Sequence, residues 1–266
     1  MPDETNQQQT PSVEEHPTYF ELHAYSGATK HMGGLSTTKE LIELCGIDEG
    51  SYVLEVGCGT GATSRYLAQN VGCRVLGVDI RPSMIDQAKE RAARGRVEER
   101  VEFRVADATA LPLEDATFDM VLVESVTTFI EDKAAAIREY ARVLRPGGCV
   151  GLNEEMWHQT PVPPEIVQYA SETWDVQAEI LTLEGWVELL RASGLTVQLA
   201  SPRRYGPLTD FSELARYGCR DFLTMLWRSA RLYFTSAPFR KYMRERRRLP
   251  KGIWDYLWYA LLVGRK

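Results

Sequence analysis

The residues with the clearest capacity for chemistry lie in one stretch, YVLEVGCGTG, at residues 52–61. Its first half is mostly apolar from Val53 to Gly57 and predicts a buried strand, and glycines then recur through the following turn. Glycine has no Cβ atom, so the backbone of such a turn can approach a ligand closely. Glu55 stands inside the strand, where a carboxylate is costly to bury unless it has a partner. The stretch therefore predicts a ligand-binding turn beside a buried negative charge.

Four further acids each end a predicted strand, namely Asp79, Asp107, Glu124 and Glu154. Asp79 follows the glycine turn by about 20 residues, where the ribose-binding acid of a nucleotide-binding fold belongs. The carboxyl ends of parallel strands meet at one edge of a sheet. We therefore expect these acids to share one rim with residues 55–61.

Apolar runs alternate with helical patterns over most of the chain. Strands are predicted at residues 53–57, 74–79, 101–107, 118–124, 149–153, 195–200 and 258–263. Pro82 opens one of the intervening helices and Pro146 stops another. Ser36 or Thr37 is expected to cap a helix that precedes the first strand. This alternation predicts an α/β fold in which a parallel sheet carries helices on both faces.

Two nucleotide cofactors fit the glycine turn. Gly57, Gly59 and Ala62 satisfy the dinucleotide pattern G-x-G-x-x-G/A, which keeps an NAD(P)-dependent oxidoreductase as an alternative. Glu55 argues against it, because a phosphate-bearing ligand needs no carboxylate nearby, whereas a cationic ligand tolerates one. The chain also offers no convincing Tyr-x-x-x-Lys pair or separate catalytic domain. A non-catalytic cofactor-binding or membrane-interaction protein is the third interpretation.

The pattern E-x-G-x-G-x-G at residues 55–61 resembles motif I of the class I S-adenosylmethionine-dependent methyltransferases. Later stretches resemble further motifs of this family at the expected places: GVDI (77–80), VADA (105–108), FDMVLVES (118–125) and LRPGG (144–148). The resemblance spans roughly residues 37–201 and returns at the C-terminus. It implies a Rossmann-like, seven-stranded class I methyltransferase sheet with an N-terminal lid helix and a helical insertion between strands six and seven. It also implies S-adenosylmethionine as the cofactor.

The stretch before the first strand, HMGGLSTTK at residues 31–39, resembles the S-G-G-L-x-A-T-K stretch of phosphoethanolamine methyltransferases. By that resemblance it is a lid that closes over the methyl donor. The resemblance implies these cofactor-binding residues: Tyr25, Met32, Gly33, Glu55, Gly57, Cys58, Gly59, Gly61, Asp79, Ile80, Met84, Asp107, Ala108, Glu124 and Ser125. Asp79 is expected at the ribose and Asp107 at the adenine.

Composition divides the chain into three parts. Residues 1–17 are poor in apolar side chains and are expected to be a disordered tail. Residues 18–202 with 254–266 are expected to form the methyltransferase domain, and 203–253 a helical insertion that covers the acceptor side. From Ser201 onward the chain carries 15 Lys and Arg against 5 Asp and Glu, although its overall net charge is −6. Asp210 and Glu213 have the spacing of a capping box, and a run rich in arginine stands at residues 244–248. The aromatic residues of the segment, among them Trp227 and Phe234, are expected to face inward and form the wall of the acceptor pocket. This basic, aromatic-rich segment is consistent with a peripheral membrane contact, an anionic acceptor or simply a solvated face.

Methyl transfer from a sulfonium is an in-line displacement that mainly requires alignment and exclusion of water. A general base is needed only for a protonated acceptor. The candidates are Tyr19, Tyr25, Glu124, Glu154 and His158, with His31 and Glu155 nearby. Phosphoethanolamine methyltransferases have a histidine shortly after strand four, where Phe129 stands here, so their substrate does not follow directly.

The expected acceptor is a small molecule or a lipid headgroup. Nucleic acid is not expected, because most of the chain is acidic and no recognition module is visible. Five scattered cysteines with no C-x-x-C pair indicate no metal site and reduced thiols, and the polar N-terminus shows no signal peptide. These features predict a cytoplasmic protein, and nothing in the sequence indicates its oligomeric state.

Overall fold

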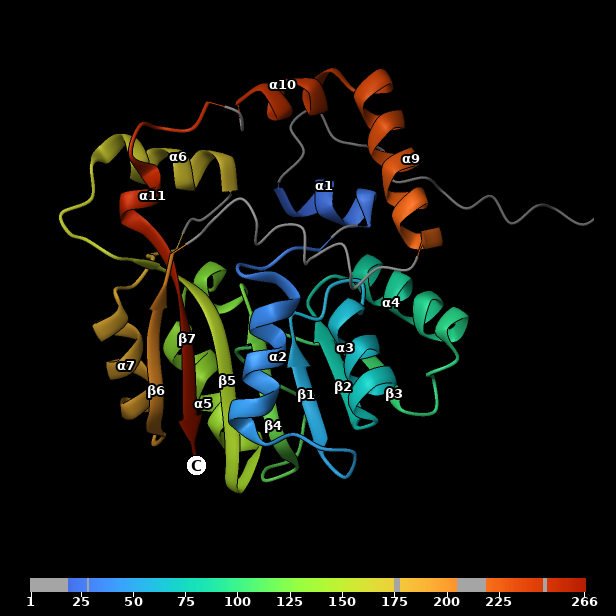
Figure 1. The fold of residues 1–266 in the computed structure, drawn as a ribbon, viewed down its shortest axis with the longest axis vertical. Helices are drawn as coiled ribbons and strands as arrows, with labels where there is room; N and C mark the ends of the chain where they lie inside the picture. The colour runs from blue at the N-terminus through green and yellow to red at the C-terminus, as the bar shows by residue number, and fades with distance from the viewer. Residues whose placement is uncertain (1–18, 28, 175–177, 205–218, 246–247) are drawn as a thin grey trace, which may run out of the picture.

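The computed structural model describes residues 19–27, 29–174, 178–204, 219–245 and 248–266 (Figure 1). Among these residues a seven-stranded sheet has the order β3-β2-β1-β4-β5-β7-β6. The strands are β1 Tyr52–Val56, β2 Arg74–Asp79, β3 Val101–Val105, β4 Phe118–Glu124, β5 Leu144–Trp157, β6 Thr196–Arg203 and β7 Leu257–Arg265. β7 runs antiparallel to both of its neighbours, and the other pairs are parallel. The predicted fold class is confirmed.

The order of the strands reverses between β1 and β4, which are parallel neighbours. In open α/β sheets, ligands bind outside the carboxyl ends of the strands at such a switch point. The residues that follow β1, β2 and β4 are therefore the candidates for binding a ligand.

Several strand boundaries differ from the sequence prediction, and those of β5 and β3 bear on the site. β5 extends from Leu144 to Trp157, well beyond the predicted 149–153, because Leu144 pairs with Phe118 of β4 and β7 pairs with β5 as far as Trp157. β3 ends at Val105 and not at residue 107. Asp107 instead lies in a turn, where its carboxylate accepts hydrogen bonds from the backbone N–H and the hydroxyl of Thr109, both at 2.8 Å.

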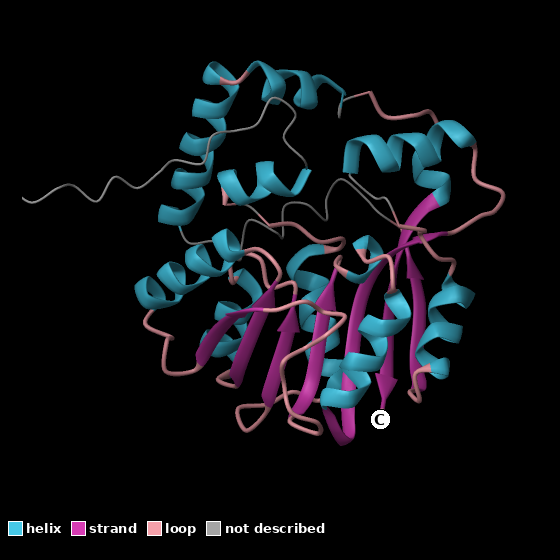
Figure 2. Cartoon of the chain, turned by 180° about the vertical axis from the view of Figure 1, so that it is seen from behind, coloured by secondary structure: helices cyan, strands magenta, loops and turns pink. Residues whose placement is uncertain are grey.

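Helices cover both faces of the sheet (Figure 2). The helices of the described residues are α1 Tyr19–Ser26, α2 Gly34–Cys45, α3 Ala62–Tyr66 continuing as a π-turn at Leu67–Val71, α4 Pro82–Gly95, α5 Lys133–Val143, α6 Pro164–Trp174, α7 Leu183–Ala192, α9 Cys219–Thr235, α10 Ala237–Glu245 and α11 Ile253–Tyr256. Of these, α1, α6, α9 and α10 lie beyond the ends of the strands and not over a face (Figure 1). Side chains alternate between the two faces of the sheet along β1, so the core has two parts. Leu54 packs with α5 and α7 on one face, whereas Val53 packs with α2 and α4 on the other.

The predicted cap of α2 is wrong. The helix begins at Gly34 behind Gly33, which has φ 76° and makes no side-chain cap. The hydroxyl of Ser36 donates to the Gly33 carbonyl at 2.7 Å, and that of Thr37 donates to the Gly34 carbonyl at 2.7 Å. Both hydroxyls are therefore inside the first turn, because a left-handed glycine pair takes the place of a capping serine or threonine.

The insertion between β6 and β7 packs against the N-terminal helix. Leu22 of α1, Leu232 of α9 and Phe239 of α10 form a small apolar cluster. The three helices lie above the carboxyl ends of the parallel strands (Figure 1). The aromatic residues expected to face inward mostly do not: Trp227 is 61% exposed and Phe234 is 79% exposed. The expected capping box at residues 210–213 and part of the 244–248 arginine run lie outside the described residues.

A buried ion cluster fastens α9 to the core. The Asp221 carboxylate lies 2.9 Å from Nη1 of Arg65 and 3.0 Å from Nη2 of Arg94, and 3.8 Å from Nε of Arg91. Burial alone would raise the pKa of Asp221, but the three arginines together lower it. Arg91 also donates to the Gly27 carbonyl at 2.8 Å and to the Thr60 hydroxyl. One arginine thus joins α4, α9, the N-terminal segment and the glycine turn.

Within the part of the chain described, none of the helices has the length and apolar character needed to cross a bilayer.

Candidate functional site

A cavity of about 590 Å³ opens at the carboxyl ends of β1, β2 and β4. Its floor is formed by residues 55–59 of the glycine turn, and α1 and the segment that follows it contribute Phe20, His23 and Thr29. No residue from the described part of the insertion lines the cavity. The helix that roofs the site is therefore α1, and α9 and α10 lie behind it.

The glycine turn takes backbone conformations that other residues rarely adopt. Gly57 has φ 69° and Gly59 has φ 52°. A Cβ atom on Gly57 would lie 2.2 Å from Val126 Cγ2, and one on Gly59 would lie 2.4 Å from Thr29 Cγ2. Both positions thus need glycine for the backbone angle and for the space, and they present bare backbone to the cavity.

Asp79 joins the end of β2 to the glycine turn. Its Oδ2 accepts a hydrogen bond from the Gly59 N–H at 3.0 Å, and its Oδ1 accepts one from the Arg81 N–H at 2.9 Å. Burial raises the pKa of Asp79, and the two backbone donors oppose that shift. The carboxylate is thus held in one orientation, and its remaining lone pairs are available at the cavity wall.

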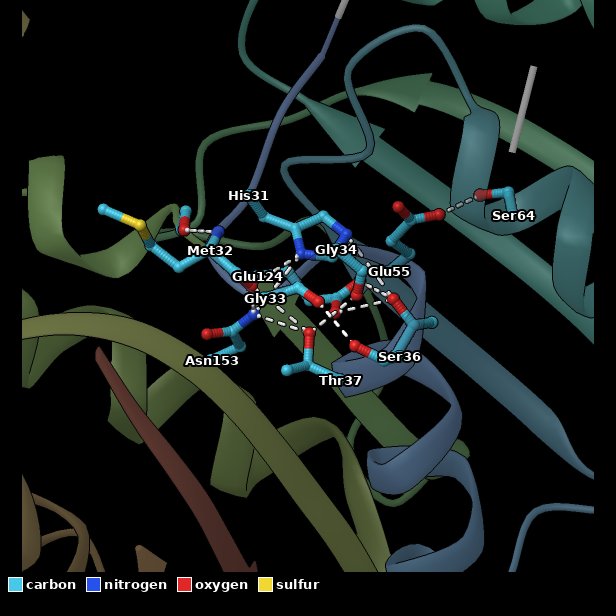
Figure 3. Close-up of polar contacts among 12 residues, drawn as sticks. His31, Met32, Gly33, Gly34, Ser36, Thr37, Glu55, Ser64, Glu124 and Asn153 are labelled. Atoms are coloured by element: carbon cyan, nitrogen blue, oxygen red, sulfur yellow. Dashed lines mark hydrogen bonds and ion pairs between the residues drawn. The ribbon is translucent and has the colours of Figure 1, made fainter. Parts of the chain in front are cut away.

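Glu55 obtains the partner that its buried position requires. Its side chain leaves β1 on the same face as Val53, toward α3, where the Ser64 hydroxyl donates to Oε2 (Figure 3). Glu55 also lines the cavity floor. A negative charge is therefore fixed directly beneath the glycine turn.

A polar network ties the segment before α2 to the ends of β4 and β5 (Figure 3). The Thr38 hydroxyl lies 2.9 and 3.1 Å from the two carboxylate oxygens of Glu124, and His31 Nε2 lies 3.5 Å from Glu124 Oε2. His31 Nδ1 lies 3.2 Å from the Met32 carbonyl, and the Asn153 amide donates to that carbonyl as well. Glu124 and His31 both line the cavity. This network holds the N-terminal segment in place over the site.

Glu154 lies beneath the rim and not on it, which corrects the sequence prediction. Its carboxylate accepts hydrogen bonds from the N–H groups of Thr127 and Thr128, at 2.9 and 3.0 Å, and from the Thr128 hydroxyl at 2.9 Å. Burial, followed by repulsion from Glu155, raises the pKa of Glu154 to about 7. The side chain braces the turn after β4 and does not reach the cavity.

The part of the chain that forms most of this site is similar to known proteins. Residues 54–152 match the family described as "Methyltransferase domain". The matched part of the chain is thus similar to a methyltransferase domain. It contains most of β1, all of β2, β3 and β4 and most of β5, and it supplies the glycine turn, Asp79, Asp107 and Glu124.

Relatives extend the comparison over more of the chain. Phosphoethanolamine N-methyltransferase 3 of Arabidopsis thaliana is 33% identical over 172 residues, 64% of this chain but 34% of the relative. The chain thus spans about a third of the length of the plant relatives that it matches. 27-O-demethylrifamycin SV methyltransferase of Amycolatopsis mediterranei is 28% identical over 86% of this chain and 82% of its own length.

A solved structure shows the same fold. Phosphoethanolamine N-methyltransferase 2 of Haemonchus contortus, in complex with phosphomonomethylethanolamine and S-adenosylhomocysteine, superimposes with a TM-score of 0.72. The superposition covers 92% of this chain and 57% of the other, at 21% sequence identity.

Most residues predicted to bind the cofactor line the cavity. They are Glu55, Gly57, Cys58, Gly59, Asp79, Ile80, Met84, Asp107, Ala108, Glu124 and Ser125. Four others lie outside the lining. Tyr25 packs in the cluster with Leu232, Met32 packs against the cluster that contains Trp157, and Gly33 precedes α2. Gly61 precedes α3 and faces the core, because a Cβ atom placed on it would meet Phe103 and Ala88.

Among the predicted catalytic residues, Glu124 lines the cavity. His158 does not, because its ring stacks on Trp258 at 3.6 Å. Tyr25 and Glu154 also lie outside the cavity lining. The side chain of Tyr19 is outside the described residues. Glu155, named beside the main candidates, does line the cavity.

Several cavity residues were missed by sequence reasoning. They include His23, Thr29, Lys30, Thr63, Arg81, Val126, Ile130, Glu131 and Asp132. Arg81 directly follows the motif GVDI, so its position was available as a signal, and its guanidinium lies 4.6 Å from the centre of the Phe20 ring. Phe129 also lines the cavity and meets Phe20 edge to face at 4.9 Å. Thr29 and Lys30 follow a helix in a segment with no motif, so no signal distinguished them. No cluster of potential metal ligands occurs in the described ranges.

Proposed function

We propose that this chain transfers a methyl group from S-adenosylmethionine to a small-molecule or lipid-headgroup acceptor. The observation that carries the proposal is the combination of an open glycine turn, a fixed ribose-type acid and a negative floor in one cavity. A sulfonium donor is cationic, so Glu55 beneath the turn stabilises it, whereas the same charge would repel the pyrophosphate of a dinucleotide. The family match over residues 54–152 supports the same reaction.

Each part of the donor has a matching group. Asp79 receives the ribose hydroxyls, and the bare backbone at Gly57 and Gly59 accommodates the amino acid end of the donor. Asp107, oriented by Thr109, lies beside the adenine. Glu124 is already engaged by Thr38 and His31, so we assign it to holding the N-terminal segment over the donor.

The division of the chain follows from this assignment. Residues 18–202 with 254–266 form the catalytic domain, because β6 and β7 complete its sheet. Within residues 203–253, α9 and α10 lie on the outer side of α1. We propose that α1 closes the acceptor side directly and that the insertion supports α1.

Adenosylhomocysteine is expected to bind the full chain in calorimetry, and NADH is expected not to bind. Replacing Asp79 by alanine removes two charge-assisted hydrogen bonds to the ribose, which weakens binding by roughly 2–4 kcal/mol, or about 30- to 1000-fold.

Asp48→Ala is the matched control for that variant. Asp48 accepts hydrogen bonds from the Gly50 N–H and the Ser51 hydroxyl, both at 3.0 Å, outside the cavity. Its loss should leave the affinity for adenosylhomocysteine unchanged. Tight NADH binding in the absence of adenosylhomocysteine binding would replace the methyltransferase assignment by an oxidoreductase.

The outer face of α9 supports a peripheral membrane contact. Asp221, Met225 and Leu232 face the protein, and the opposite face presents an apolar stripe at helical spacing. The stripe comprises Leu223, Leu226, Trp227, Ala230 and Phe234. Arg220, Arg231, Lys241 and Arg244 are exposed on α9 and α10. Apolar and aromatic side chains among cations suit the surface of an anionic bilayer, whereas a second copy of this basic face would repel it.

The full chain should therefore sediment with vesicles of phosphatidylcholine and phosphatidylglycerol, and less at high salt. Leu223→Ser removes a side chain whose burial contributes about 1.5–3 kcal/mol, so partitioning should fall about tenfold or more. Leu44→Ser is the control, because Leu44 is also exposed (42%, against 63% for Leu223) but lies on α2. Absence of vesicle binding by the parent chain, or self-association that Leu223→Ser abolishes, contradicts a membrane role.

A further inference from the structure

Glu155 presents an unused carboxylate oxygen to the cavity. Its side chain is 9% exposed and lines the cavity, and its Oε2 is buried with no hydrogen-bond partner in the described structure. A buried carboxylate oxygen without a donor is costly. The oxygen therefore lacks a partner that a bound molecule can supply.

The backbone around Glu155 is rigid. β5 pairs with β7 at this position, opposite Tyr259, and the Glu155 carbonyl accepts a hydrogen bond from the indole N–H of Trp186 at 3.1 Å. Trp186 is fully buried. The direction of the side chain is thus set by the core of the sheet, as a binding residue requires.

The hydrogen bonding of Glu155 differs from that of the adjacent Glu154. Side chains alternate along a strand, so Glu154 points to the opposite face, where Thr127 and Thr128 satisfy both of its oxygens. The hydroxyls of Ser125 and Thr128 both face the Glu155 carboxylate, but they leave its Oε2 without a donor. Contacts with the turn after β4 therefore account for both oxygens of Glu154 but not for Oε2 of Glu155.

The cavity as a whole is negatively charged. Seven of its lining residues are Asp or Glu and two are Lys or Arg. The donor brings a sulfonium, an ammonium and a carboxylate, so it neutralises about one of these charges. A further cation or N–H donor is attracted to the remaining negative potential.

We propose that Glu155 Oε2 binds a nitrogen-bound hydrogen of the acceptor, so that the acceptor of this methyltransferase is an amine. The inference rests on the proposed methyl transfer. The neutral amine lone pair attacks the methyl carbon, a C–N bond forms, and the C–S bond breaks with its electron pair returning to sulfur. The new ammonium then gives a proton to the Glu155 carboxylate, which releases it to water when the product leaves.

Burial raises the pKa of Glu155, which brings its proton affinity closer to that of an amine in the same cavity. Phe129 and Phe20 add aromatic faces to the same cavity, and such faces attract cationic amines. Both features favour a nitrogen nucleophile over an alcohol or a carbon acid.

The test uses pairs of probes that differ in one group, measured by calorimetry with the full chain saturated with adenosylhomocysteine. Ethanolamine is compared with ethylene glycol, and phosphoethanolamine with 2-hydroxyethyl phosphate. The parent chain should bind the amine of at least one pair tenfold or more tightly than its hydroxyl counterpart. Glu155→Gln should remove that preference while the affinity for adenosylhomocysteine changes less than twofold.

Glu154→Gln is the matched control, since it changes the adjacent glutamate outside the cavity and should keep the preference. Equal binding of amine and hydroxyl probes by the parent chain overturns the proposal. So does an unchanged preference in Glu155→Gln, or failure of every amine to bind while adenosylhomocysteine binds. Failure of adenosylhomocysteine itself to bind overturns the proposed function instead, so the two failures are distinguishable.

Discussion

Replacing Asp221 by asparagine should lower the free energy of unfolding by about 3–5 kcal/mol. Removing one partner of a buried ion cluster leaves the remaining charges uncompensated in a poorly solvated place, and such changes cost about that much. Arg65 and Asp221 are both nearly buried, with side chains 12% and 10% exposed. Urea denaturation of the two proteins, followed by circular dichroism, measures the difference.

Glu102→Gln is the matched control for this variant. The Glu102 carboxylate lies 2.7 Å from Arg104, but both side chains are about half exposed. Breaking such a surface pair costs about 0–1 kcal/mol. A loss below 1 kcal/mol in Asp221→Asn as well would mean that α9 is not fastened to the core by this cluster.

Replacing Gly57 by alanine should destabilise the fold by about 2–5 kcal/mol and weaken binding of adenosylhomocysteine more than tenfold. An alanine at φ 69° costs about 1–2 kcal/mol. Its Cβ atom would also lie 2.2 Å from Val126 Cγ2, and relief of such an overlap adds about 1–3 kcal/mol. Either the turn or Val126 must move, and both line the cavity. Thermal denaturation and calorimetry measure the two effects.

Gly147→Ala separates the backbone angle from the overlap. Gly147 has φ 80°, and no heavy atom lies within 4 Å of a Cβ atom placed there. This variant should therefore lose about 1–2 kcal/mol of stability and keep its affinity for adenosylhomocysteine. Equal losses in the two variants would show that Val126 accommodates the methyl group.

The sequence predicted the residues whose position is set locally. β2 and β4 have the predicted bounds, and the glycine turn and Asp79 meet as expected, because each follows a buried strand whose direction is fixed by the sheet. The end of β5 was not predictable from local pattern. Two consecutive glutamates at this end of the strand led to the prediction that Glu154 lies on the rim of the site. The hydrogen-bond donors that hold its carboxylate beneath the rim come from residues 127 and 128, more than 20 positions away.

The buried face of the insertion was also not predictable from local sequence pattern. Its composition predicted helices, and α9 and α10 are helical. Which face of α9 is buried depends on Asp221 meeting arginines from α3 and α4, over 120 positions earlier in the chain. Trp227 and Phe234 were therefore placed on the wrong side, because apolar type alone does not distinguish a core face from an exposed stripe. The positions of His31 and Glu155 relative to the cavity depend likewise on contacts between distant segments.

The place of β7 in the sheet constrains how this protein is made. Residues 257–265 lie between β5 and β6, pairing with β5 on one side and β6 on the other. While the ribosome is still synthesising this stretch, β6 has no strand to join and one edge of β5 is unpaired. An unpaired edge of this kind is a template for aggregation, and segments of long sequence separation pair late. During synthesis, β1 to β5 can therefore pair with one another before β7 is available to cover the free edge of β5. A chaperone that binds exposed strand edges would act most usefully at this stage.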